Sequence, residues 1–73
     1  MIYCIIVMSS VTYALKAQGV LAREGIGTRL EKLSKNQTSK GCGYGLRIER
    51  VHLQEASAIL KREKINITEV IDY

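Results

Sequence analysis

The chain has 73 residues, of which 47% are hydrophobic and 25% charged, and its net charge is +4. This length holds a single domain, 1–73, and the balanced composition excludes a disordered chain. No apolar run approaches the roughly 18 residues of a membrane span, and the first residues resemble no signal peptide. We therefore expect no membrane association. Because the two cysteines show no pairing pattern, we also expect a cytoplasmic protein.

A buried strand and a helix are predicted first. Residues 2–8 are apolar at both alternating sets of positions, as in a central strand, so the pattern leaves open which set faces the core. Ser9 or Ser10 caps the helix that follows, and Gly25 ends it. Gly19, inside this helix, indicates close packing of helix on sheet. The predicted buried stripe consists of Val11, Ala14, Leu15, Leu21 and Ala22.

The remaining chain predicts two strands, a helix and a closing strand. Residues 26–33 alternate in the manner of an edge or half-buried strand, and the polar segment 34–43 is a connecting loop. The third strand, second helix and last strand are expected at 44–49, 51–63 and 65–71.

This order of elements predicts an α+β fold of the ferredoxin-like βαββαβ type. Right-handed crossovers place both helices on one face of a four-stranded antiparallel sheet. One apolar set of the first strand then lies on the open face. That surface predicts a ligand platform or a homodimer.

The positive charge is concentrated in the middle of the chain. Six basic residues and two acids lie from Arg29 to Arg50, so this span carries the whole net charge of +4. Such an asymmetry indicates an anionic partner, a cationic setting for a thiol, or a solvated loop.

The densest chemical signal surrounds Cys42. Gly41 and Gly43 flank this cysteine, and glycine neighbours allow backbone N–H groups to converge on an anion such as a thiolate. Lys40, and Arg47 if the loop folds back, would lower the thiol pKa further. The alternative is that a small residue merely fits a tight turn.

The other candidate sites are weaker. Cys4 lies among apolar residues of the first strand and is expected to be buried and inert. One histidine, His52, with two cysteines makes no convincing zinc site, and no sequence motif calls for a cofactor.

The chain resembles, over almost its whole length, a family of small bacterial domains described as selenium/sulfur carrier protein-like. The matching features are Ala14-Leu15-Lys16-Ala17, Gly25-Ile26, Cys42-Gly43-Tyr44-Gly45-Leu46-Arg47, Leu53-Gln54-Glu55-Ala56 and the strand that begins at Ile65. The resemblance implies that Cys42 accepts sulfur or selenium, as a persulfide or its selenium equivalent. It also implies donor and acceptor proteins as partners, and a carrier in place of a free-standing enzyme.

Two binding functions compete with the carrier. Residues 40–47 follow in part the RNA-recognition pattern K/R-G-F/Y-G/A-F/Y, in which Lys40, Gly41, Gly43 and Tyr44 agree. Cys42 and Arg47 replace two of its aromatic positions, and each lost ring costs about 1–3 kcal/mol of base stacking. The second rival is a regulatory ferredoxin-like module that binds a small molecule and has no catalytic role.

Overall fold

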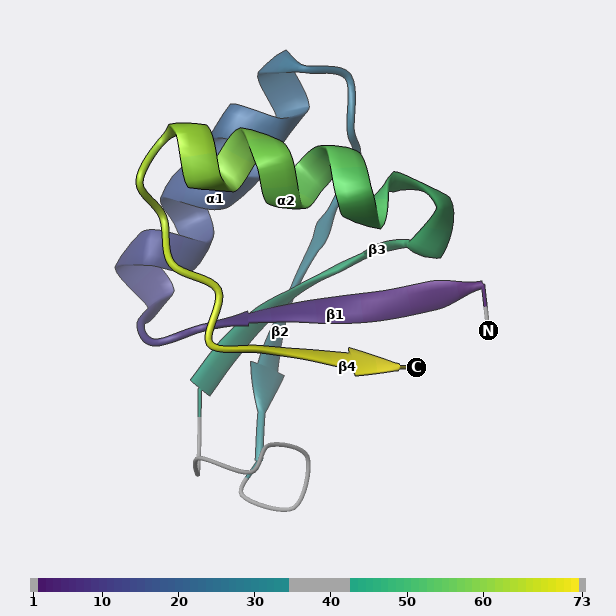
Figure 1. The fold of residues 1–73 in the computed structure, drawn as a ribbon. Helices are drawn as coiled ribbons and strands as arrows, with labels where there is room; N and C mark the ends of the chain where they lie inside the picture. Colours follow the sequence, from purple (N-terminus) through teal and green to yellow (C-terminus); the bar gives the residue numbers. More distant parts are fainter. Residues whose placement is uncertain (1, 35–42, 73) are drawn as a thin grey trace.

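The sheet and its two helices follow the predicted order. The computed structural model describes residues 2–34 and 43–72 (Figure 1). The elements are β1 (Tyr3–Met8), α1 (Val11–Arg23), β2 (Arg29–Leu33), β3 (Gly43–Glu49), the 3-10 turn η1 (Arg50–His52), α2 (Leu53–Arg62) and β4 (Glu69–Asp72). The strand order is β2-β3-β1-β4 and every neighbouring pair is antiparallel. This arrangement confirms the predicted ferredoxin-like fold.

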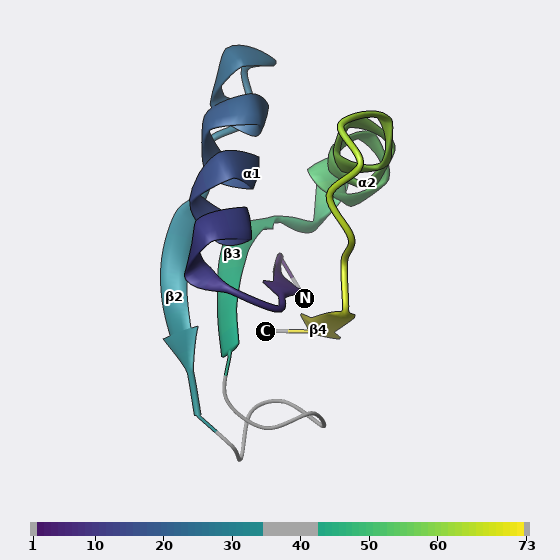
Figure 2. The same ribbon diagram turned by 90° about the vertical axis from the view of Figure 1, so that its left-hand side faces the viewer.

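Both helices cover the same face of the sheet, and β1 forms the centre of the core. Figure 2 shows α1 over β2 and β3, with α2 towards β4. Cys4, Ile6 and Met8 of β1 are buried beneath the helices. Ile5 and Val7 point to the opposite face, where they pack with Leu33 and Ile71. The structure thereby decides which of the two apolar sets of β1 faces the helices.

Helix α1 buries a different stripe from the one predicted. Ser10 caps it, since its hydroxyl oxygen accepts a hydrogen bond from the Tyr13 N–H at 3.3 Å. The residues buried against the sheet are Ala14, Ala17, Val20 and Leu21. Leu15 is 51% exposed and Val11 37% exposed, and Ala22 is exposed as well. The prediction is confirmed for Ala14 and Leu21. It was wrong for Val11, Leu15 and Ala22, because two alanines let the helix approach the sheet along a face that hydropathy alone does not mark.

Gly19 is not a packing glycine. It lies on the exposed side of α1, and a Cβ atom built there would have no neighbour within 4 Å. The predicted close packing at this position is therefore wrong, and Gly19 only lowers the helix propensity of α1.

Both helices end in the same hydrogen-bonded turn, and this turn delays the next strand. Gly25 (φ 83°) and Lys64 (φ 61°) adopt the left-handed conformation that follows a helix end. The next residues bond back to the helix: Ile26 N–H to the Leu21 carbonyl and Ile65 N–H to the Leu60 carbonyl, each at 2.9 Å. Both isoleucines are buried in the core.

As a result, the second and fourth strands begin later than predicted. β2 begins at Arg29 instead of residue 26, and β4 at Glu69 instead of residue 65. Thr68 joins β4 to β1, since its N–H and its hydroxyl both donate to the Val7 carbonyl, at 2.9 and 3.0 Å.

The turn between β3 and α2 is tied to both neighbouring strand ends. The Arg50 N–H donates to the Ile2 carbonyl at 2.7 Å, and its guanidinium pairs with Asp72, the last residue of β4. Because this segment forms the 3-10 turn η1, the regular helix α2 starts two residues later than predicted, at Leu53. Neither of the described helices has the length and apolar character needed to cross a membrane.

Candidate functional site

The predicted site lies at the end of the sheet where β3 begins. Lys40, Gly41 and Cys42 are outside the described residues. Gly43 is the first residue of β3 and pairs with Leu33, the last residue of β2. A Cβ atom on Gly43 would lie 3.4 Å from the Met8 carbonyl oxygen, so this residue abuts the end of β1. Gly43 itself therefore packs against the backbone of β1.

Arg47 lies on the same face of β3 as Gly43, but its side chain is engaged with other residues. Its guanidinium carbon lies 5.2 Å from the centre of the Tyr3 ring, within range of a cation–π interaction. Its Nε atom lies 4.0 Å from the Glu31 carboxylate. Arg47 lies four residue steps along β3 from Gly43, a distance of about 13 Å. The structure thus brings Arg47 together with Tyr3 and Glu31.

Gly45 occupies a position where no side chain fits. A Cβ atom there would lie 2.4 Å from Cγ2 of Ile5 and 3.2 Å from both Cδ1 of Leu33 and the Ile6 carbonyl oxygen. The side chains of Ile5 and Leu33, 2% and 1% exposed, therefore fill the space above this glycine. Gly45 is required for packing of the open face.

The open face carries little of the aromatic platform that an RNA-recognition module uses. Tyr44 lies on the helix side of β3 and packs, half-buried, against the main core. Among the described residues, Tyr3 supplies the aromatic ring on the open face, and Arg47 covers it. Ile5, Val7 and Leu33 are buried within the chain itself, so the homodimer through this face stays a prediction.

Cys4 has the properties of a structural cysteine. Its side chain is fully buried between the sheet and the helices. Burial raises the pKa of the Cys4 thiol; Arg50 opposes the shift and Asp72 adds to it. A buried thiol with a raised pKa supplies little thiolate, which is the nucleophilic form. Cys4 is thus poorly suited to accept sulfur.

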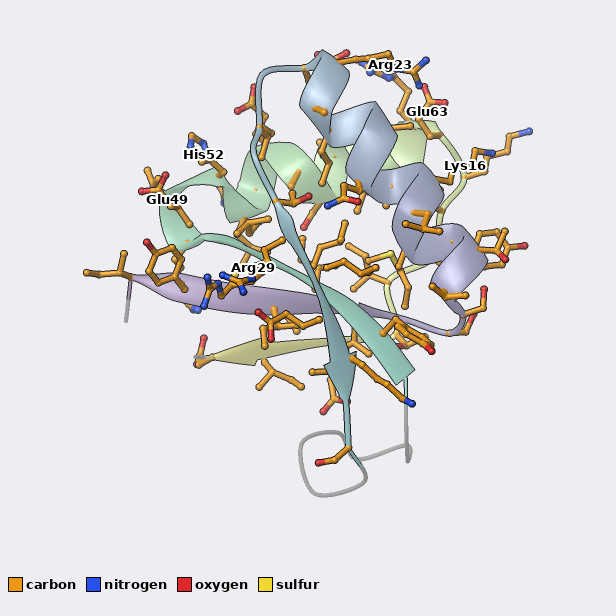
Figure 3. The ribbon with its side chains drawn as sticks, turned by 180° about the vertical axis from the view of Figure 1, so that it is seen from behind. Lys16, Arg23, Arg29, Glu49, His52 and Glu63 are labelled. Atoms are coloured by element: carbon orange, nitrogen blue, oxygen red, sulfur yellow. The ribbon has the colours of Figure 1, made fainter. Side chains whose placement is uncertain are left out.

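His52 lies at the opposite end of the sheet from Gly43. Its Nε2 atom is 4.0 Å from the Glu49 carboxylate, and Figure 3 shows the two side chains near each other. Within residues 2–34 and 43–72, no group of three or more His, Cys, Asp or Glu side chains is placed to hold a metal ion.

Sequence reasoning did not find the grouping of Tyr3, Glu31 and Arg47. The alternation of polar and apolar residues places each of them on one face of its strand. However, their meeting depends on the register of three strands, which pairs Tyr3 with Glu49 and Glu31 with Gly45. No local pattern encodes that register.

Comparison with protein families relates nearly the whole chain to one of them. A family model described as "Putative Se/S carrier protein-like" matches residues 3–72. The matched range includes every described strand and helix and the segment that contains Cys42. Neither the curated proteins nor the solved structures include a match to the chain.

Proposed function

This chain belongs to the Se/S carrier protein-like family, and we propose that it carries sulfur, or its selenium equivalent, on Cys42. In this proposal a donor protein loads Cys42 with a persulfide, and an acceptor protein then takes up the terminal atom. The family match across residues 3–72 is the observation that carries the proposal.

The burial of Cys4 supports the choice of Cys42. A carrier of this kind needs a thiolate that a second protein can reach. The chain has two cysteines, and Cys4 is enclosed in the core with a raised pKa. Cys42 is the cysteine left for the task.

The charge around Cys42 suits a thiolate. Lys40 is two residues away in the sequence, and the glycines on both sides, Gly41 and Gly43, allow backbone N–H groups to converge on a thiolate.

The transfer requires no cofactor. The Cys42 thiolate attacks the outer sulfur of the donor's R–S–SH group, and a new S–S bond forms while the donor's S–S bond breaks. The donor leaves as its thiolate, and Cys42 becomes Cys–S–SH. A nucleophile on the acceptor then attacks the outer sulfur and restores the Cys42 thiolate. We assign this exchange to the reducing cytoplasm.

The first test measures the reactivity of the Cys42 thiol. The rate of alkylation is followed against pH in a Cys4→Ala variant, and the mass is recorded after incubation with a low-molecular-weight persulfide. We expect an apparent pKa below the ordinary value of about 8.5, together with a gain of one sulfur atom. Cys42→Ser should abolish both signals.

A matched pair of charge variants tests the electrostatic part. Lys40→Gln should raise the pKa of Cys42 and slow alkylation at neutral pH, whereas Lys16→Gln, on α1, should leave both unchanged. An ordinary thiol pKa without sulfur uptake would contradict the carrier. The binding module without a catalytic role, for RNA or a small molecule, would then be preferred.

A further inference from the structure

Helix α1 carries a row of apolar side chains on its exposed side. Val11, Leu15 and Ala22 follow one another at the spacing of a single helix face, with Gln18 between them. We call these four residues the α1 row. Its three apolar side chains are exposed, although the hydropathy of the sequence predicts that they are buried. The single chain therefore leaves apolar surface in water along this row.

The α1 row lies beside the outer edge of β2. The Gln18 side chain donates from Nε2 to the carbonyl of Thr28, the residue before β2, at 3.5 Å. In the strand order β2-β3-β1-β4, β2 pairs with β3 on one side, and no described strand pairs with its other side. Figure 3 shows α1 and β2 together in front of α2 and the other strands. One side of the molecule therefore combines an exposed apolar row with an open strand edge.

The charges on β2 complement those of a second, identical β2 strand. Arg29 and Glu31 lie on the open face of the sheet, and Leu30 between them lies on the helix side. When two antiparallel copies of β2 pair around Leu30, Arg29 of each copy lies directly opposite Glu31 of the other. Opposite charges at such positions stabilise a sheet, and like charges destabilise it. Moving the centre of the pairing to Arg29 or to Glu31 places like charges opposite each other, so the charges favour the register centred on Leu30.

The Arg29 side chain is free to form such a pair. It is 72% exposed, and its Nε atom lies 3.9 Å from Oε2 of Glu31 in its own chain. The other arginine near Glu31 is Arg47, whose Nε atom is 4.0 Å from the same carboxylate. Because Arg47 belongs to β3, it lies on the inner side of β2. An arginine from a second copy would approach Glu31 from the outer side.

We propose that this chain forms a homodimer in which the outer edges of two β2 strands pair, antiparallel and centred on Leu30. The two sheets then form one continuous sheet, with a twofold axis between the two Leu30 residues. The pairing gives hydrogen-bond partners to backbone groups along the β2 edge. It also brings the two α1 rows towards each other on the helix side, and the burial of their apolar side chains favours the dimer.

A second copy of the chain fits this surface better than a strand of another protein, because the charges of β2 are self-complementary. The interface is distinct from the open face of the sheet, where Ile5, Val7 and Leu33 are already buried within the chain. It is also independent of the sulfur chemistry proposed for Cys42. Dimerisation and sulfur uptake are measured separately, so the failure of one proposal leaves the other standing.

The first test measures the mass of the complete chain against concentration by sedimentation equilibrium. We expect a monomer at low concentration and a species of twice its mass at high concentration. NMR spectra along the same dilution series locate the interface. The amides of Leu30 and Lys32 in β2 should shift with concentration, whereas those of Val70 and Ile71 in β4, the other edge strand, should not.

Two charge reversals test the register. Arg29→Glu opposes two acidic side chains across the interface, and Glu31→Arg opposes two basic ones, so each variant alone should dimerise about tenfold more weakly or worse. A mixture of the two variants should recover the affinity, because every opposed pair then joins an acid and a base. This recovery also shows that both variants are folded. Lys61→Glu, on α2, changes the net charge as Arg29→Glu does and should leave dimerisation unchanged.

A charged substitution in the α1 row tests the contact between the helices. Leu15→Glu should weaken the dimer by about tenfold or more, since a charge would be buried. Val51→Glu alters an exposed apolar residue of η1, outside the interface, and should have no effect.

Three results would overturn the proposal. The first is a chain that stays monomeric up to about 1 mM, which would leave the β2 edge to a strand of another protein. The second is a set of concentration-dependent shifts in β4 in place of β2. The third is a mixture of Arg29→Glu and Glu31→Arg that associates no more strongly than either variant alone.

Discussion

Replacing Gly45 with alanine tests whether this glycine serves packing or the chemistry of residues 40–47. The new Cβ atom would lie 2.4 Å from Cγ2 of Ile5, more than 1 Å closer than ordinary carbon–carbon contact. Ile5 is branched at Cβ and 2% exposed, so neither rotation nor a shift into solvent relieves the clash easily. Overpacking of this kind costs about 1–3 kcal/mol. For a chain of this length, a loss of about 2 kcal/mol lowers Tm by roughly 8–16 °C.

Thermal and urea denaturation of Gly45→Ala measure this loss. Gly43→Ala is the matched control, because its nearest contact would be 3.4 Å, and its effect should be clearly smaller. In an Ile5→Ala background the cost of Gly45→Ala should fall, since the clashing methyl group is removed. If the unfolding free energy of Gly45→Ala lies within about 0.5 kcal/mol of that of the original protein, the packing argument is wrong.

Three further predictions concern stability. Above the ordinary cysteine pKa of about 8.5, the unfolded state loses the Cys4 proton that the buried thiol keeps, so the unfolding free energy should fall by up to about 1.4 kcal/mol per pH unit. Urea denaturation from neutral to alkaline pH should show this fall in the original protein and not in Cys4→Ala. The same pH dependence of the unfolding free energy in both proteins would contradict the prediction. Gly19→Ala should raise the unfolding free energy by up to about 1 kcal/mol, since the new methyl group meets no atom within 4 Å; a lower Tm would refute this. Lys64→Gly should raise the unfolding free energy by about 0.5–1 kcal/mol, because glycine adopts the left-handed backbone (φ 61°) without strain. Lys61→Gly, within α2, should lower it. Thermal denaturation in which both variants shift Tm in the same direction would count against the argument.

The order of the elements could be predicted from the sequence because it depends on local chemistry. The Ser10 cap and the Gly25 helix end act over a few residues and appear in the structure where their patterns indicated. The short apolar runs gave the order of the strands, but not the starts of β2 and β4. The matching turn at the end of α2 was not predicted, because a lysine, Lys64, occupies the position where glycine is usual. Its consequence, the late start of β4, was missed with it.

The placement of side chains on faces was only partly predictable. Both alternating sets of β1 are apolar, so hydropathy could not choose between Cys4 and Ile5 for the helix side. In α1, Leu15 is more hydrophobic than Ala17, yet Leu15 is exposed and Ala17 buried. Close approach of helix to sheet requires a small side chain, and that requirement arises only when the two elements meet.

The sequence by itself determined the βαββαβ order, the family resemblance and the choice of Cys42 as the residue to test. The tertiary structure decided that Cys4 is buried, and that Tyr3, Arg29 and Arg47 line one cavity. These residues come from three strands that are distant in the sequence. Their meeting depends on strand register, which is set by long-range pairing and core packing and by no local pattern.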